Sequence, residues 1–260
     1  MKFCANLSFM FTEGTTILER YALAKDAGFK AVETGFPLGH TLEQVKQAKE
    51  SACVQQVLVN LKTGDVSKGE LGVTAVPGKE DEFKENLKTT IEYAKAVNAS
   101  KIHIMAGKLD NVTNENWTTF ESNLKYAADI LSKDNLLAVI EPINQHSVPK
   151  YFLSNYDTAV DIIKRINSPH LKLQLDIFHL QHICGDLSNN IKKLMPYVGH
   201  VQIAQVPYRN EPNTPGEINY QYILPLLESN GYNDWIGLEY KPAAGSKDGL
   251  KWIKEFGYSL

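Results

Sequence analysis

Residues 137–144 read LAVIEPIN, an apolar run that should be fully buried and yet closes on a carboxylate, Glu141. The same arrangement returns at three later places in the chain. The matching stretches are LKLQLD (171–176), GHVQIAQV (199–206) and WIGLEYKP (235–242). Short apolar runs rich in β-branched residues are typical of buried strands in a parallel sheet. The four stretches therefore predict four strands that each end in a polar side chain.

Such strands alternate with longer amphipathic segments along the whole chain, which is typical of βα units. Thr16 and Thr41 each begin a capping-box pattern, and Asn155 and Asp186 are candidate caps of later helices. Eight strands are predicted, at KFCANLS (2–8), KAVETGF (30–36), CVQQVLVNL (53–61), KIHIMAG (101–107), LLAVIEPIN (136–144), LKLQLDIFH (171–179), HVQIAQV (200–206) and WIGLEYK (235–241).

Eight strands in strict alternation with eight helices predict an α/β fold, a closed (β/α)8 TIM barrel that forms one domain over residues 1–260. The main alternative, an open doubly wound sheet, usually carries a glycine-rich phosphate loop after an early strand. Neither GxGxxG nor GxxxxGK[ST] occurs in the sequence, and this disfavours the open sheet.

The charge and hydrophobicity of the chain bear on its possible binding partners. The net charge is -3, and no dense cluster of Lys and Arg is present, so we expect no nucleic-acid partner. No apolar segment reaches the roughly 18–20 residues that span a bilayer, so we expect no membrane partner. Without a recognisable targeting segment, we expect a cytoplasmic protein, and the sequence is compatible with a homo-oligomer.

Two connections are too long for simple turns. Residues 62–81 follow the third strand and residues 207–219 follow the seventh. The first contains Val66 and Leu71 among its apolar residues, which favours a lid that docks on the barrel over a disordered linker. Both leave the carboxyl ends of strands, where TIM-barrel active sites are built.

The four strand-ending side chains should meet at that end of the barrel. They are Glu141, Asp176, Gln202 and Glu239, spaced by 35, 26 and 37 residues (176-141, 202-176, 239-202), about one βα unit each. Three carboxylates without a cation would repel one another, so we predict that these four residues bind a divalent metal. Oxygen donors favour Mg2+ or Mn2+, and Zn2+ or Co2+ remain open.

The stretches EPIN, DIFH, GHVQIAQVP, PGEINY and GLEYKP also carry a resemblance. In this order they resemble the hydroxypyruvate isomerase branch of the xylose isomerase-like barrels, relatives of sugar epimerases. The similarity extends over nearly the whole chain, through the GDVSKGELGVTAVPGKEDEF loop. It implies that Glu141 and Glu239 are the catalytic, proton-transferring pair and metal ligands, and that Asp176 and Gln202 complete the coordination. Gln202 favours the isomerase branch, because related epimerases more often have histidine there.

Four further residues are assigned to substrate binding. Arg209, in the loop after the seventh strand, is the candidate for a substrate carboxylate, which suits a planar guanidinium. The resemblance places a histidine at His179, and His103 on the fourth strand should point into the barrel beneath the site, unless it is a hydrogen-bonded core histidine. Lys79 stands where this branch has arginine, so a bidentate anion contact is lost there.

The activity that the resemblance implies is the interconversion of hydroxypyruvate and tartronate semialdehyde, a small hydroxy-carbonyl acid pair, by proton transfer through an enediolate. The first alternative is a ketose 3-epimerase or inosose-type dehydratase, which would be favoured if no cation lay near the distal end of the substrate. An abasic-site endonuclease would need several histidine ligands and a basic groove, and neither is present in the sequence. A non-catalytic, metabolite-binding barrel is opposed by the presence of both Glu141 and Glu239.

Overall fold

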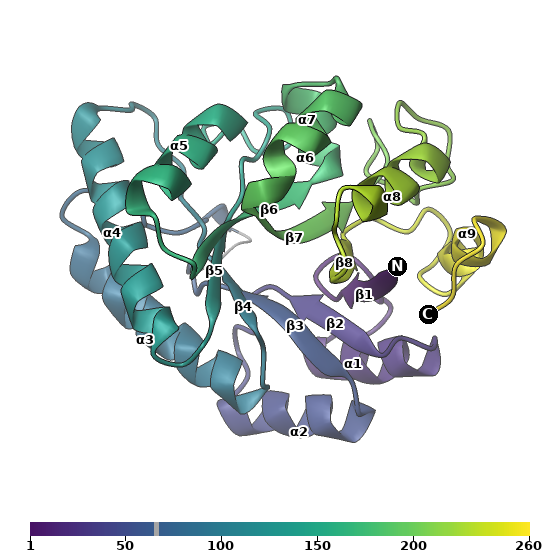
Figure 1. The fold of residues 1–260 in the computed structure, drawn as a ribbon. Helices are drawn as coiled ribbons and strands as arrows, with labels where there is room; N and C mark the ends of the chain where they lie inside the picture. Colours follow the sequence, from purple (N-terminus) through teal and green to yellow (C-terminus); the bar gives the residue numbers. More distant parts are fainter. Residues whose placement is uncertain (65–67) are drawn as a thin grey trace.

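The computed structural model describes residues 1–64 and 68–260 of the chain. Eight parallel strands pair in chain order, and β8 closes on β1, so the sheet is a closed barrel (Figure 1). This confirms the predicted (β/α)8 TIM barrel, and each strand overlaps the stretch predicted for it. The strands are β1 (Lys2–Asn6), β2 (Ala31–Thr34), β3 (Gln55–Asn60), β4 (Lys101–His103), β5 (Leu137–Ile140), β6 (Leu171–Asp176), β7 (Val198–Ile203) and β8 (Trp235–Leu238).

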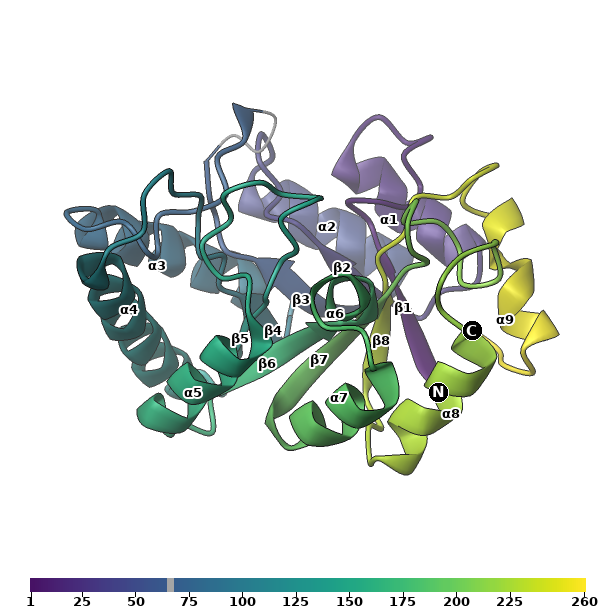
Figure 2. The ribbon, with the colours of Figure 1, turned by 90° about the horizontal axis from the view of Figure 1, so that it is seen from above.

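Helices surround the barrel (Figures 1 and 2). They are α1 (Ile17–Asp26), α2 (Leu42–Ala52), α3 (Glu80–Ala96), α4 (Asn114–Ser132), α5 (Tyr156–Ile166), α6 (Ile177–Ile183), α7 (Leu187–Leu194), α8 (Tyr220–Ser229) and α9 (Lys251–Glu255), with short 3-10 turns at Met195–Tyr197 and Asp248–Leu250. The predicted strict alternation is wrong between β6 and β7, where both α6 and α7 occur. Helix α6 begins directly after β6 because the carboxylate of Asp176 accepts a hydrogen bond from the backbone N–H of Phe178, at 2.9 Å, and caps it.

Three of the four predicted helix caps are confirmed. Thr16 and Thr41 both form complete capping boxes, and the side chain of Asn155 accepts a hydrogen bond from the first turn of α5. Asp186 lies at the N-cap position of α7, but the prediction that it caps this helix is wrong. Its backbone is left-handed (φ 42°), and its carboxylate accepts hydrogen bonds from the side chain of Asn189 instead of from the helix backbone.

The main hydrophobic core joins the strands to the surrounding helices, as at Phe3 on β1, whose ring meets that of Trp252 on α9 edge to face at 5.3 Å between centroids. The strands also bury polar side chains. Glu33, Gln174, His200 and Gln202 lie on β2, β6 and β7 with at most 1% of their surface exposed. The barrel therefore contains polar groups that must find their hydrogen-bond partners inside the protein.

The described part of the loop between β3 and α3 packs onto the end of β4. The hydroxyl of Thr74 donates a hydrogen bond to the carbonyl of Met105 (2.7 Å), and the N–H of Ala75 donates to the carbonyl of Ala106 (3.1 Å). Gly72 has φ +98°, and a Cβ at this position would lie 2.6 Å from the Met105 carbonyl oxygen. This docking agrees with the prediction from the loop's apolar residues, of which Val66 lies outside the described residues.

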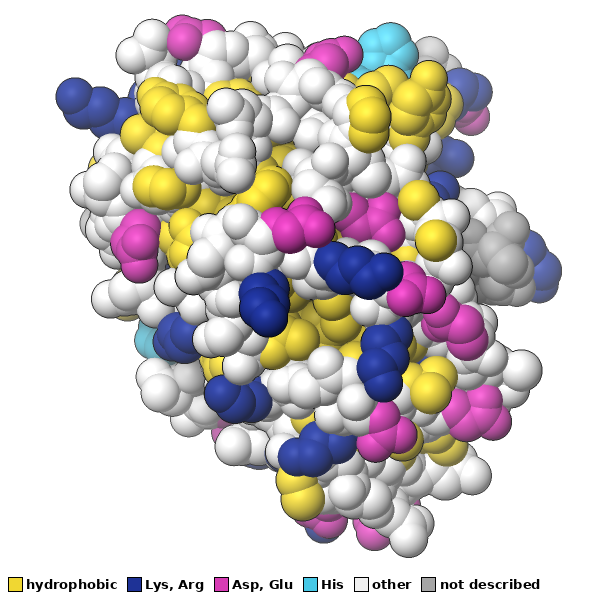
Figure 3. Space-filling model, turned by 90° about the vertical axis from the view of Figure 1, so that its right-hand side faces the viewer, with side chains coloured by type: hydrophobic (Ala, Val, Ile, Leu, Met, Phe, Trp, Pro, Cys, Tyr) yellow, Lys and Arg dark blue, Asp and Glu magenta, His cyan; other side chains and the backbone are white. Residues whose placement is uncertain are grey.

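The surface carries charges of both signs. On the face shown in Figure 3, Lys and Arg side chains are interspersed with Asp and Glu. Among the described residues, no helix is both long enough and apolar enough to cross a membrane.

Candidate active site

Three carboxylates converge at the carboxyl ends of the strands. Asp176 is the last residue of β6, and Glu141 and Glu239 directly follow β5 and β8. Glu141 and Asp176 are buried, whereas the side chain of Glu239 is 13% exposed. The positions agree with the prediction that polar strand ends meet in the mouth of the barrel.

Arg209, from the loop after β7, lies among these carboxylates. Its Nη2 donates hydrogen bonds to Oδ2 of Asp176 (3.2 Å) and to Oε2 of Glu239, and its Nε donates to the backbone carbonyl of Glu239 (3.2 Å). The guanidinium carbon lies 4.6 Å from the ring centroid of Phe9 and 4.7 Å from that of Phe178. Two aromatic faces and two carboxylates thus hold the cation.

One guanidinium does not balance three carboxylates. Burial raises the pKa of Glu141 well above its ordinary value, and the negative charges of Glu239 and Asp176 raise it further. Burial likewise raises the pKa of Glu239 to about 8 and that of Asp176 to about 6, although Arg209 opposes both shifts. Without a further cation the cluster retains protons near neutral pH.

A divalent cation fits this donor set. Oε1 of Glu141 is buried and has no hydrogen-bond partner among the described residues. A carboxylate oxygen of Glu141 and one of Asp176 lie within 4.8 Å of each other, and the group of side chains within this distance includes His179 but not Glu239. Carboxylate oxygens around an unsatisfied buried oxygen suit Mg2+ or Mn2+.

His179 faces the same cluster, but the ring nitrogen that it directs there carries a proton and is a hydrogen-bond donor. The backbone N–H of Asn144 donates to its Nδ1 at 3.2 Å, and the side-chain amide of Asn144 lies 2.7 Å from the same nitrogen. The amide oxygen of Asn144 accepts a hydrogen bond from Ser147, so its NH2 group faces the ring. Nδ1 is therefore the acceptor, and the proton lies on Nε2, which is 3.6 Å from Asp176 Oδ2 and 3.8 Å from Glu141 Oε1. In this tautomer His179 donates to an oxygen and does not bind a metal.

Gln202 lies on β7 and is connected to the carboxylate cluster through the side chain of Gln174. Its NH2 group donates to Oε1 of Glu33 (2.7 Å), and its carbonyl oxygen accepts from Nε2 of Gln174 (2.7 Å). The same nitrogen of Gln174 also donates to Oε2 of Glu141 (3.1 Å). The carbonyl oxygen of Gln202 is thus directed toward the carboxylates and away from Glu33.

Two other predicted substrate-binding residues differ in placement. His103 is buried beside the site, with Nε2 3.6 Å from Oε2 of Glu141, and burial lowers its pKa to about 3, so its ring is neutral. Lys79 precedes α3, is exposed, and pairs with Glu82 at 2.8 Å. Lys79 is not among the residues that line the cavity described next, so contact with a substrate there would require its loop to move.

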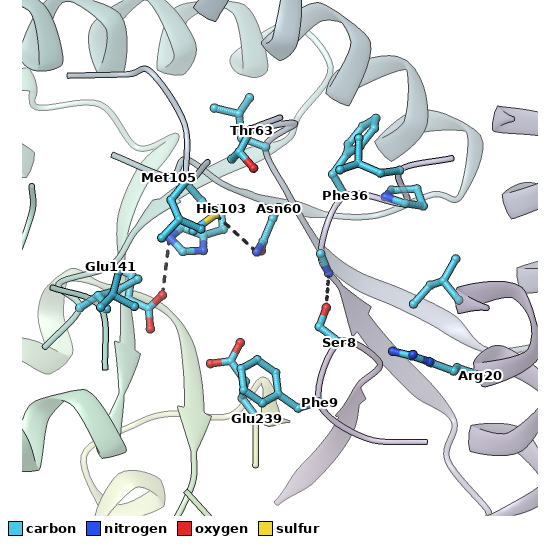
Figure 4. A pocket seen from close by; sticks show the side chains of 18 of the residues that line it. Ser8, Phe9, Arg20, Phe36, Asn60, Thr63, His103, Met105, Glu141 and Glu239 are labelled. Atoms are coloured by element: carbon cyan, nitrogen blue, oxygen red, sulfur yellow. Dashed lines mark hydrogen bonds and ion pairs between the residues drawn. The ribbon is translucent and has the colours of Figure 1, made fainter. Parts of the chain in front are cut away.

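The cavity at the mouth of the barrel has a volume of about 600 Å3 (Figure 4). Glu141, Glu239, His103, His179 and Arg209 line one part of it. The rest is lined chiefly by the loops after β1 and β2, which supply Ser8, Phe9, Thr15, Thr16, Phe36 and His40, and by α1, which supplies Arg20.

Three residues of this region were not found from the sequence. Asn6 donates hydrogen bonds from its Nδ2 to both Glu239 (2.9 Å) and Glu33 (2.8 Å), and Gln174 bridges Glu141 and Gln202. The available signal was a polar residue inside an apolar strand, Glu33 in AVET and Gln174 in LKLQLD. That signal does not say which face of the strand the side chain occupies.

Comparison with known proteins gives consistent results. A sequence model of the xylose isomerase-like TIM barrel family matches residues 21–256. A relative from Danio rerio is 43% identical and covers 98% of this chain and 95% of its own. Hydroxypyruvate isomerase from Escherichia coli is 37% identical and covers 98% and 99%, and 2-oxo-tetronate isomerase from Cupriavidus necator is 37% identical and covers 98% of each. The crystal structure of AP endonuclease, family 2, from Brucella melitensis is 39% identical, covers 98% of each chain and superposes with a TM-score of 0.93.

Proposed function

The chain belongs to the xylose isomerase-like TIM barrel family and is an isomerase, and from this premise we propose that it interconverts hydroxypyruvate and 2-hydroxy-3-oxopropanoate (tartronate semialdehyde). The observation that carries the proposal is the pair Glu141 and Glu239, two carboxyl groups that line one cavity from the ends of β5 and β8. A carboxylate positioned in this way can take up a proton from a substrate carbon and return it.

The reaction needs two proton movements and no other reactant. A proton leaves the hydroxymethyl carbon, the electron pair forms the double bond of an enediolate, and a proton is added to the neighbouring carbon. The hydroxyl proton moves to the former carbonyl oxygen, so the product is the aldehyde isomer. One of Glu141 and Glu239 transfers the carbon-bound proton, and the other serves the oxygen-bound proton from across the substrate plane.

The remaining residues orient the substrate. Nε2–H of His179 donates to a substrate oxygen, because Asn144 fixes the proton on that nitrogen. Arg209 receives the carboxylate, held by the rings of Phe9 and Phe178. The neutral ring of His103 lies beside Glu141, with Nε2 3.6 Å from its Oε2.

Glu141, Asp176, Gln202 and Glu239 would hold Mg2+ or Mn2+. When bound, such an ion would supply positive charge next to the two substrate oxygens and stabilise the negative charge of the enediolate.

A second substrate, 2-oxo-tetronate, is supported by the relative from C. necator and by the cavity. A volume of about 600 Å3 is far larger than a three-carbon acid requires, since pockets of ~300–1,000 Å3 enclose drug-sized ligands.

The test is solvent exchange followed by NMR. The metal-loaded enzyme is incubated with hydroxypyruvate in D2O, beside Glu141→Gln, Glu239→Gln and a control, Glu82→Gln, on the exposed surface of α3. We expect the two site variants to lose exchange at the hydroxymethyl carbon by roughly 10²–10⁴-fold, and the control to retain it. Exchange at the parental rate in both site variants would remove the pair from catalysis.

A further inference from the structure

A large part of the cavity has no function in the reaction as described. Glu141 and Glu239 lie on one side in Figure 4, and Arg20 lies on the opposite side from Glu141, with Ser8 between Arg20 and Glu239 in this view. A three-carbon acid held at the carboxylates leaves the wall around Arg20 without a ligand. The cavity is therefore shaped for a longer molecule.

Arg20 is a cation without an ion pair among the described residues. Its Nε donates to the carbonyl of Gly14 (3.0 Å) and its Nη1 to the carbonyl of Leu7 (2.9 Å), which fixes the side chain but does not balance its charge. Hydrogen bonds, and to a lesser degree the charge of Arg20, lower the pKa values of Glu13 and Glu19, but neither acid forms an ion pair with Arg20: Glu19 caps its own helix, and Glu13 accepts hydrogen bonds from the loop after β8. The guanidinium fork retains donors for an anion.

Ser8 adds a second donor on the same wall. Its Oγ accepts a hydrogen bond from the N–H of Gly35 (2.8 Å), and among the described residues no acceptor takes its hydroxyl proton. Apolar side chains, including Phe36 and Leu61, also line this cavity. An anionic group here would meet a charged and a neutral donor.

We propose that Arg20 and Ser8 form a distal anion-binding site, and that the enzyme accepts hydroxy-carbonyl compounds longer than three carbons whose end remote from the reacting carbons carries a carboxylate or a phosphate ester. This inference rests on the proposed isomerase function. A cation at the distal end of the cavity also opposes the alternative of a barrel built for neutral ketoses.

The experiment compares matched ketoses in the metal-loaded enzyme. Fructuronate has a remote carboxylate, fructose 6-phosphate has a remote phosphate, and fructose has neither. We expect kcat/KM for one of the two anionic sugars to exceed that for fructose at least tenfold. Arg20→Gln should remove this preference, Arg20→Lys should retain part of it, and Arg165→Gln, on the exposed surface of α5, should leave it unchanged.

The two anionic sugars separate a carboxylate site from a phosphate site. Turnover of hydroxypyruvate with no preference for either anionic sugar over fructose would overturn the distal site alone. Absence of hydroxypyruvate turnover in the parent enzyme would instead refute the proposed function. A preference that survives in Arg20→Gln would also overturn the assignment to Arg20.

A second inference concerns the buried carboxylate of Glu33, which lies inside the barrel beneath the cluster. Glu33 on β2 is fully buried, and three nitrogen donors converge on it. Its Oε1 accepts from Asn6 (2.8 Å) and Gln202 (2.7 Å), and its Oε2 lies 2.6 Å from Nε2 of His200. Gly237 on β8 makes room for this carboxylate, because a Cβ there would lie 2.6 Å from its Cδ atom.

Lys101 determines which ring nitrogen of His200 carries the proton. Nζ of Lys101, which can only donate, lies 3.3 Å from Nδ1 of His200 and pairs with Asp234 at 2.7 Å. Nδ1 therefore accepts and Nε2 donates to Glu33. With His200, Asn6 and Gln202 all donating, Glu33 is an acceptor on both oxygens, and it determines which end of each amide faces it.

We infer that Glu33 is a positioning residue for the metal site. Because an amide that directs its NH2 toward Glu33 must direct its oxygen the other way, Glu33 directs the carbonyl oxygen of Gln202 toward Gln174 and the carboxylates. Asn6 is oriented in the same way, because its one side-chain nitrogen donates hydrogen bonds to the carboxylates of both Glu33 and Glu239. Glu33 itself needs no contact with substrate or metal for this effect.

The readout is Mn2+ affinity, measured by electron paramagnetic resonance without substrate. Glu33→Gln puts an NH2 group among the three donors, and we expect Mn2+ binding to weaken about 10–100-fold, as is typical when a group that orients metal ligands is lost. Gln56→Leu is the control: Gln56 is a buried polar residue on β3 that bonds to Tyr21, Thr34 and the Leu58 carbonyl, so its loss should lower stability without weakening Mn2+ binding.

A swap of the two side chains tests orientation directly. The double variant Glu33→Gln with Gln202→Glu restores one donor facing one acceptor, and it keeps the charge inside the barrel. We expect the double variant to bind Mn2+ more tightly than Glu33→Gln does. Where Glu33→Gln does not fold, we expect the Mn2+ affinity of the double variant to lie within about tenfold of that of the parent. Parental Mn2+ affinity in Glu33→Gln, or no binding in the swap, would overturn the role of Glu33.

Discussion

Raising the pH from 7 to 8 should destabilise the metal-free protein, because the folded chain keeps protons that the unfolded chain has lost. Burial raises the pKa of Glu239 to about 8 and that of Glu141 well above its ordinary value, with neighbouring carboxylates adding to both shifts. In the unfolded chain both groups ionise near pH 4.5. Above that pH the unfolded state binds fewer protons, so the free energy of unfolding falls as the pH rises.

The magnitude follows from the number of protons. One proton changes the free energy of unfolding by ~1.4 kcal/mol per pH unit. Between pH 7 and 8, Glu239, with a pKa of about 8, contributes most of one proton, or about 1 kcal/mol, and the raised pKa of Glu141 acts in the same direction. Buried His103 and His179, whose pKa values are lowered by burial, act in the opposite direction, but mainly below about pH 7, where unfolded histidine is protonated. The expected net loss is at least about 1 kcal/mol.

Urea unfolding at pH 7 and pH 8 in the presence of a chelator measures this loss. Glu239→Gln is the matched variant, and its loss over the same interval should be smaller by about 1 kcal/mol because its amide does not titrate. Mn2+ should stabilise the parent more at pH 8 than at pH 7, since cation and protons compete for the same oxygens. Equal stability of the metal-free parent at both pH values would refute the account of the carboxylate cluster.

Three other changes test separate parts of the structure. Gly72→Ala, at φ +98° against the end of β4, should lower the free energy of unfolding by about 1–3 kcal/mol, measured by urea titration; no loss would contradict the docked loop. Asn144→Leu removes the side-chain amide that lies 2.7 Å from Nδ1 of His179 but keeps the backbone N–H that donates to the same nitrogen, so it should lower kcat only by the several-fold expected for one lost hydrogen bond; steady-state kinetics with an unchanged kcat would refute a role of this side chain in holding the ring. Phe178→Leu removes one ring from Arg209 and should raise the KM for hydroxypyruvate several-fold, as expected for the loss of about 1 kcal/mol; an unchanged KM would exclude a contribution of the ring to substrate binding.

The sequence predicted the barrel because each strand carries its own apolar pattern and the polar strand ends recur at the spacing of a βα unit. It also predicted Glu141, Asp176 and Glu239 at one site, because the carboxyl ends of barrel strands converge whatever the loops do. The split of one connection into α6 and α7 was missed, because Asp176 serves both as a strand end and as a helix cap.

Other features depend on packing that no local pattern encodes. Glu33 and Gln174 are polar residues inside strands, and only barrel closure determines that they face Gln202. Arg20 occupies an ordinary exposed-looking position in an amphipathic helix, and its place on the cavity wall follows from the path of the loop after β1. Lys79 was assigned to substrate binding because the resembled branch has an arginine at this place, and in the structure it pairs with Glu82 of α3.

The central claim is that Glu141, Asp176, Gln202 and Glu239 hold one divalent cation at the open end of the barrel. Anomalous X-ray diffraction from crystals grown with Mn2+ tests it most directly. We predict a single strong anomalous peak within about 2.0–2.4 Å of an oxygen from each of the four side chains, and its loss in the Glu239→Gln variant. A peak bound elsewhere, or none in this cluster at saturating Mn2+, would contradict the account.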